Sequence, residues 1–121
     1  MTDRHKSQTA EDHYYAALDF YAEGHHAEAI AEYEAAIAAD PAFVDAMHGL
    51  ARVYQDTGEL DKAIATARRI SEIDPDDVLA HTSLSILYQR KGMVPEAEAE
   101  GNKARILGWK QQLKQKREQS E

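Results

Sequence analysis

Residues 44–77, VDAMHGLARVYQDTGELDKAIATARRISEIDPDD, contain the pattern that decides the fold. Met47, Leu50 and Tyr54 share one helical face, and Gly58 then interrupts the pattern. A second face follows the glycine and carries small or apolar residues, namely Ala63, Ala67 and Ile70. The block therefore predicts two amphipathic helices joined by a glycine turn.

The same landmarks recur 34 residues before and 34 residues after this block. In the preceding block they fall on His13, Ala16, Ala17, Phe20, Gly24, Ala29, Tyr33, Ala36 and Pro41. In the following block they fall on His81, Leu84, Ser85, Tyr88, Gly92, Ala97, Gly101, Ala104 and Trp109. Because the glycine is kept in all three blocks, we expect three similar helix pairs.

This period, with its order of small residue, glycine, small residue and proline, resembles the tetratricopeptide repeat over residues 10–111. The pattern departs from the family where His13 and His81 replace an apolar residue, and where Gly101 and Trp109 replace an aromatic residue and a proline. The resemblance implies an all-α helical repeat solenoid of three antiparallel helix pairs plus a capping helix. It also implies a protein-binding role without naming a ligand.

The domain boundaries follow from the repeats. We expect a disordered lead-in at 1–8, a repeat domain at 9–118 and a disordered tail at 119–121. The predicted repeats cover 10–43, 44–77 and 78–111, and a capping helix covers about 109–118. The predicted helices span about 9–24, 26–39, 42–56, 60–73, 77–91 and 95–107.

Polar and conformationally special residues mark the predicted helix ends. Thr9 is the expected N-cap of the first helix. Pro41 and Pro75, each after an aspartate, are expected at first helical positions, where the missing N–H is not needed. Trp109 and Leu113 are expected to cover the third repeat from the capping helix, after a break at Gly108.

The residues at the expected helix crossings are small and let the helices of a pair approach closely. They are Ala17, Ala29, Ala51, Ala63, Ser85 and Ala97. The aromatic residues Phe20, Tyr33, Tyr54 and Tyr88 are expected to fill the space between layers.

Charge is distributed unevenly along the chain. The formal net charge is +1 over residues 1–10, −13 over residues 11–100 and +4 over residues 101–121. An acidic body repels phosphate backbones, so we expect no nucleic-acid partner. The basic C-terminal segment is compatible with docking to an acidic protein surface, to anionic lipid or to a second copy of the chain, and equally with a solvated helix.

The composition gives little support for chemistry. The chain has no cysteine, and its six histidines are not spaced to converge on one ion, so we expect no metal site and no cofactor. No catalytic motif is present, and we predict that the protein is not an enzyme. The sequence shows no secretory signal and no membrane span, so we expect a cytoplasmic protein; the mature start of a processed exported protein would look the same.

The resemblance places the first helix of each pair along a concave groove that binds peptides. The predicted groove residues are Tyr14, Leu18, Tyr21, His48, Arg52, Gln55, Leu79, Thr82, Ile86 and Gln89. Leu18, Leu79 and Ile86 point away from the predicted core, which favours an apolar groove with Arg52 at its centre. One subclass of the family grips a C-terminal carboxylate, but the corresponding positions here lack the Lys, Arg and Asn residues that this requires. Those positions are Tyr14, Leu18, Gly49, Leu79 and Ser83.

The predicted function is therefore a protein-interaction module or assembly scaffold that binds a protein or peptide segment in its groove. Two alternatives stay open: a fixed accessory subunit of a larger complex, and a chaperone resembling the repeat chaperones of bacterial secretion. Homo-oligomerisation is compatible with either.

Overall fold

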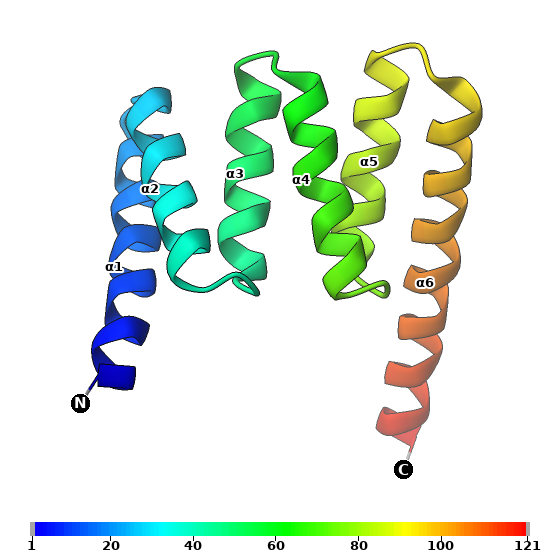
Figure 1. The fold of residues 1–121 in the computed structure, drawn as a ribbon. Helices are drawn as coiled ribbons and strands as arrows, with labels where there is room; N and C mark the ends of the chain where they lie inside the picture. The colour runs from blue at the N-terminus through cyan, green and yellow to red at the C-terminus, as the bar shows by residue number, and fades with distance from the viewer. Residues whose placement is uncertain (1, 121) are drawn as a thin grey trace.

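The computed structural model describes the backbone of residues 2–120 and the side chains of residues 9–120. That part of the chain forms α1 (Thr2–Ala22), α2 (His26–Ala39), α3 (Val44–Asp56), α4 (Leu60–Ile73), α5 (Val78–Arg90) and α6 (Val94–Ser120), without a strand. Each helix packs mainly on its neighbours in the chain, and the helices stand side by side in sequence order (Figure 1). The predicted all-α repeat stack of three antiparallel helix pairs is confirmed.

Glycine turns join the two helices of each pair. Gly24, Gly58 and Gly92 have φ of +79°, +80° and +77°, a conformation that residues with a β-carbon rarely adopt. The residue after each glycine donates its backbone N–H to a carbonyl in the last turn of the helix. These bonds join His25 to Phe20, Glu59 to Tyr54 and Met93 to Tyr88, at 2.9, 2.9 and 2.8 Å. The recurring glycine therefore ends each first helix by the same motif.

The turns between pairs differ from the prediction. Pro41 and Pro75 lie within turns, and α3 and α5 begin three residues after each proline. In the first of these turns, Asp40 Oδ1 accepts a hydrogen bond from the Ala42 N–H at 3.1 Å, and the second turn repeats this bond. An Asp-Pro pair favours such a turn because the carboxylate bonds two residues on and the proline fixes φ. The prediction that the prolines occupy first helical positions is therefore wrong.

The core is built from small residues at the helix crossings and larger ones between layers. Ala17, Ala29 and Ala63 are fully buried, and Ser85 Oγ donates to the Ala97 carbonyl at 2.8 Å across α5 and α6. The largest fully buried side chains are Tyr33, Met47, Val53, Ile70, Leu84 and Leu87. The predicted close helix crossings are thus present.

A buried ion pair explains one histidine at an apolar position. His81 is 6% exposed, with Nδ1 2.6 Å from Glu100 Oε2 and Nε2 2.7 Å from the Pro75 carbonyl. Burial lowers the pKa of His81, but the Pro75 carbonyl and the Glu100 carboxylate outweigh it, so the pKa is raised. His13 and Glu32 form the matching pair in the first repeat, also at 2.6 Å. The histidines hold the helices of a pair together.

The N-terminal end of the domain differs from the prediction. α1 already begins at Thr2, so Thr9 lies inside the helix and is not its N-cap. Residues 2–22 contain no glycine or proline, so a helix nucleated against the core extends backward over the predicted disordered lead-in. Met1, within that lead-in, lies outside the described residues.

The C-terminal end also differs, because no separate capping helix forms. α6 runs without a break through Gly108 to Ser120, and its last turns project past the loop that joins α4 to α5 (Figure 1). Trp109 is 60% exposed and Leu113 is 37% exposed, so neither covers the third repeat. One glycine inside a helix costs about 1 kcal/mol, which is too little to end an established helix. Glu121, in the predicted tail, lies outside the described residues.

Candidate functional site

A groove of about 650 Å³ runs across the first helices of the three pairs. It is lined by Tyr14, Leu18 and Tyr21 of α1, Tyr33 of α2, Asp45, His48, Gly49, Ala51, Arg52, Gln55 and Asp56 of α3, and Leu79, Thr82, Ser83, Ile86 and Leu87 of α5. The volume lies within the range of sites that hold ligands or side chains of partners, roughly 300–1,000 Å³. The three first helices supply all of this lining except Tyr33, because the repeat returns each first helix to the same side.

Apolar side chains that the core does not use lie in this groove. Leu18, Leu79 and Ile86 are exposed to solvent, although α1 and α5 bury other residues in the core. An amphipathic helix of a monomeric protein would normally present polar residues here. Apolar surface gathered in a concave site, rather than scattered, is typical of protein interaction sites.

Hydrogen bonds between neighbouring helices fix the polar walls of the groove. The Tyr21 hydroxyl donates to Asp56 Oδ2 at 2.5 Å, which joins α1 to α3. This bond is the main cause of the raised pKa of Tyr21, burial adds to it, and nearby Arg52 partly offsets it. On the other side, His48 Nε2 lies 2.8 Å from Asp77 Oδ2 at the start of α5. The groove is therefore braced at both of its helix junctions.

Arg52 supplies positive charge near the middle of the groove. It is exposed on α3, and among the groove residues that the structure describes it is the one Lys or Arg. Asp45 and Asp56 line the same groove. The site therefore combines an apolar surface with charged groups of both signs, an arrangement that can bind and orient a polypeptide segment.

Nine of the ten groove residues predicted from the sequence line this one groove, and Gln89 does not. Gln89 instead lines a separate cavity of about 380 Å³ between α5 and α6, together with Val94 and Arg105. Its equivalents Tyr21 and Gln55 are each flanked by the first helix of the next pair. Gln89 instead lies beside α6, the second helix of its own pair.

The sequence-based site omitted several groove residues. Asp56 lies one turn after Arg52, a spacing that signals the same helical face. Gly49 shows no side-chain signal in the sequence, yet its place is specific, because a β-carbon there would overlap the Tyr33 ring. Such a contact between two helix pairs appears only in the folded structure.

Within the described residues, no group of three or more His, Asp or Glu side chains is arranged to hold a metal ion. In the same part of the chain, no helix is both long and apolar enough to cross a membrane.

Comparison with known proteins places this geometry in context. A model of the tetratricopeptide repeat matches residues 20–87, more than half of the chain. Photosystem I assembly protein Ycf3 of Synechococcus sp. strain CC9605 is 26% identical over 102 residues, which cover 82% of this chain and 59% of that protein. The chain thus spans about three fifths of the length of this curated relative.

Solved structures share the arrangement of the helices. The crystal structure of MamA superimposes with a TM-score of 0.84 at 30% identity, over 86% of this chain and 61% of that one. SycD, the type III secretion translocator chaperone of Yersinia enterocolitica, has a TM-score of 0.78 at 25% identity, over 84% of this chain and 75% of that one. The repeat model matches from the end of α1 into α5, and the structure shows three stacked helix pairs. The chain therefore belongs to the tetratricopeptide repeat family.

Proposed function

We propose that this protein is a non-catalytic interaction module whose concave groove binds a segment of a partner protein. The observation that carries the proposal is the position of Leu18, Leu79 and Ile86, three exposed apolar side chains from two helices that line one groove. The relatives named as an assembly protein and a secretion chaperone support the same class of function.

Apolar burial supplies most of the binding free energy in this proposal. Each 100 Å² of apolar surface removed from water contributes about 2.5 kcal/mol before the cost of ordering the partner. Arg52 then fixes the direction of the segment by pairing with a carboxylate or a backbone carbonyl. The bonds from Tyr21 to Asp56 and from His48 to Asp77 hold the walls in place, which lowers the entropic cost of binding.

The partner segment is internal rather than a terminal carboxylate held by several cations. Arg52 is the one Lys or Arg in the described groove, whereas a carboxylate clamp uses converging Lys, Arg and Asn side chains. Leu79 and Ile86 lie two turns apart on α5, about 10 Å, so a segment with apolar residues about two helical turns apart matches their spacing.

The test uses a random peptide library displayed on phage and selected on the purified full chain. We expect the selected peptides to be rich in apolar residues, and Leu18→Glu and Ile86→Glu to weaken their binding by about tenfold or more. Ile73→Glu is the matched control, because Ile73 is 42% exposed, Ile86 is 44% exposed, and Ile73 lies outside the groove. Equal binding by all three variants, with unchanged melting temperatures, would rule out the groove.

The same variants separate the two groove-binding roles, adaptor and chaperone, from a fixed accessory subunit. If the wild type captures several unrelated clients from the native source and Ile86→Glu does not, an adaptor or a chaperone is favoured. Capture of one stoichiometric complex by both proteins favours a fixed accessory subunit that uses the convex face or the ends. The cytoplasmic location and the absence of catalysis stay predictions.

A further inference from the structure

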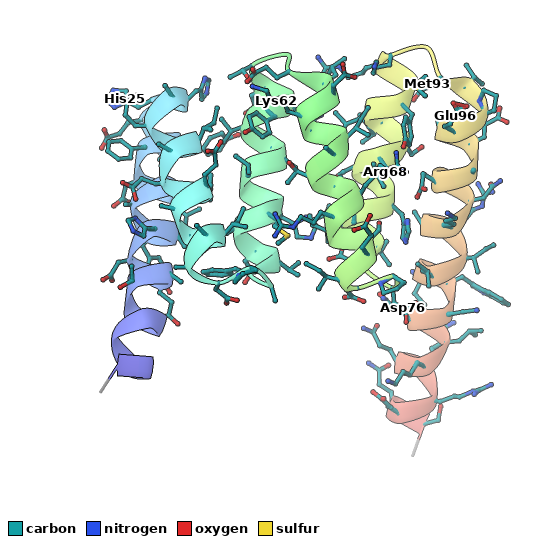
Figure 2. All side chains as sticks on the ribbon, in the orientation of Figure 1. His25, Lys62, Arg68, Asp76, Met93 and Glu96 are labelled. Carbon is teal, nitrogen blue, oxygen red and sulfur yellow. The ribbon has the colours of Figure 1, made fainter. Side chains whose placement is uncertain are left out.

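The C-terminal part of α6, residues 109–120, forms an arm beyond the helix stack. Every residue from Trp109 to Ser120 is exposed, and Figure 2 shows the side chains at this end of α6 pointing into open space beyond the other helices. A helical segment of this length without packing partners is marginally stable in water. A binding partner along the arm would stabilise it.

The arm has one apolar side with basic flanks. Trp109 and Leu113, with Ile106 just before the arm, are exposed at spacings of three and four residues, which puts them on one side of the helix. At 100° per residue, Lys110 and Lys114 follow one edge of this stripe, and Lys116 lies on the other. The arm thus presents an apolar stripe between positive charges.

The groove has the complementary properties. Leu18, Leu79 and Ile86 offer apolar surface. The two carboxylates beside it, Asp45 and Asp56, outnumber the one cation of the described groove, Arg52. Across the chain, residues 11–100 carry a net charge of −13 and residues 101–121 carry +4. The arm of one molecule and the groove of another therefore match in both polarity and charge.

The dimensions also match. The 12 residues of the arm form a helix about 18 Å long, and three first helices packed in sequence span about 20 Å. The arm does not reach its own groove, because α6 continues straight along the outer side of α5 and away from the stack (Figure 1). The complementary groove is therefore that of another molecule.

We propose that the arm of one copy docks in the concave groove of a second copy, head to tail. This inference rests on the proposed function, because it assigns the same groove an occupant. Such an interface is heterologous, so repetition builds either a ring or an open filament. An anionic membrane is the less favoured occupant, because its surface would repel the acidic stack that carries the arm.

Analytical ultracentrifugation of the full chain over a range of concentrations tests the proposal. We expect the wild type to self-associate, and Trp109→Glu in the arm and Ile86→Glu in the groove each to raise the dissociation constant by about tenfold or more. Ile73→Glu should associate like the wild type. Raising the salt concentration should weaken association several-fold, because charge complementarity contributes to it.

Mixing the two variants gives the sharper result. Trp109→Glu keeps an intact groove and Ile86→Glu keeps an intact arm, so the mixture can form one interface and should give a 1:1 dimer although each variant alone is monomeric. Circular dichroism melts confirm that both variants are folded. A mixture that stays monomeric while the wild type associates overturns the head-to-tail arrangement.

Two further outcomes also overturn the inference. The first is a wild type that is monomeric at every concentration. The second is an arm that binds phosphatidylserine vesicles in a cosedimentation assay while Trp109→Glu and Ile86→Glu leave self-association unchanged. The phage-selected peptides keep this failure distinct from failure of the proposed function. A monomeric wild type that binds them through Ile86 retains the groove as a partner site, whereas peptide binding that survives Ile86→Glu removes it.

Discussion

Replacing Gly49 with alanine should destabilise the protein, although the same change inside a helix normally stabilises it. Gly49 lies within α3, and a β-carbon there would overlap the Cε1, Cζ and hydroxyl atoms of Tyr33 from α2. Tyr33 is 1% exposed, so its ring has little freedom to move within the core. Its nearest open space is the groove, which the ring already lines.

The magnitude follows from two opposing terms. Alanine is favoured over glycine inside a helix by about 1 kcal/mol. Overpacking a buried contact costs roughly 1–3 kcal/mol. The net loss in the free energy of unfolding should therefore be about 1 kcal/mol, equivalent to a decrease of about 4 °C in melting temperature for a chain of this size.

Two other helical glycines provide matched controls. A β-carbon at Gly108 meets no other described atom within 4 Å, so Gly108→Ala should leave the melting temperature unchanged or raise it. At Gly101 the β-carbon would lie 3.1 Å from Ser85 Oγ, a tight but adjustable contact, so Gly101→Ala should fall between the two. The three glycines thus predict an order of stability that helix propensity alone does not.

Thermal melts followed by circular dichroism, with urea titrations for the free energy, measure this order. In a Tyr33→Leu background the ring is absent, so the cost of Gly49→Ala should disappear and the double-mutant cycle should show coupling. Stabilisation by Gly49→Ala in the otherwise wild-type protein would refute the proposed contact between α2 and α3.

Three further predictions follow from the core and the ends. Ala63→Leu should lower the free energy of unfolding by about 1–3 kcal/mol while Ala63→Ser has a smaller effect, as measured by urea titration, because Ala63 is fully buried; equal stability of the two variants would contradict the close crossing. The raised pKa of His81 means that its contribution to stability is complete below its unfolded pKa of about 6.5 and is lost as pH rises through the folded value. Melts from about pH 6 to 9 should show this loss in the wild type but not in the double variant His81→Met, Glu100→Thr, which copies Met47 and Thr66 of the middle repeat; a parallel pH dependence in both proteins would exclude the ion pair as its source. Deleting residues 109–121 should change the melting temperature by no more than about 2 °C, because every residue from Trp109 to Ser120 is exposed; a large decrease would mean that the arm packs on its own molecule.

The sequence by itself determined the number of helix pairs and the faces of their helices. Both depend on local physics: the 3.6-residue period sets the faces, and the positive φ needed at Gly24, Gly58 and Gly92 ends each first helix. Once the repeat register is known, residues such as Leu18 and Ile86 must lie on the side opposite the core. Nine of the ten predicted groove residues therefore line the groove.

The same reasoning could not place features that depend on neighbouring elements. An Asp-Pro pair is compatible with a helix start and with a turn. Here the turn forms, because Asp40 and Asp74 each accept a hydrogen bond from the backbone N–H two residues later. Gly108 is compatible with a helix break and with a continuous helix. The helix continues through it because α6 is already established from Val94. Local sequence leaves both alternatives nearly equal in free energy.

Only the tertiary structure assigned roles to residues whose partners are distant in the chain. Gly49 is specified by Tyr33 on another helix, His81 by Glu100 nineteen residues away, and Gln89 by the cavity that α5 forms with α6. The repeat period fixes the direction of each side chain, but contact energies depend on which atoms the packed neighbours bring within a few ångströms, and that is set by the stack as a whole.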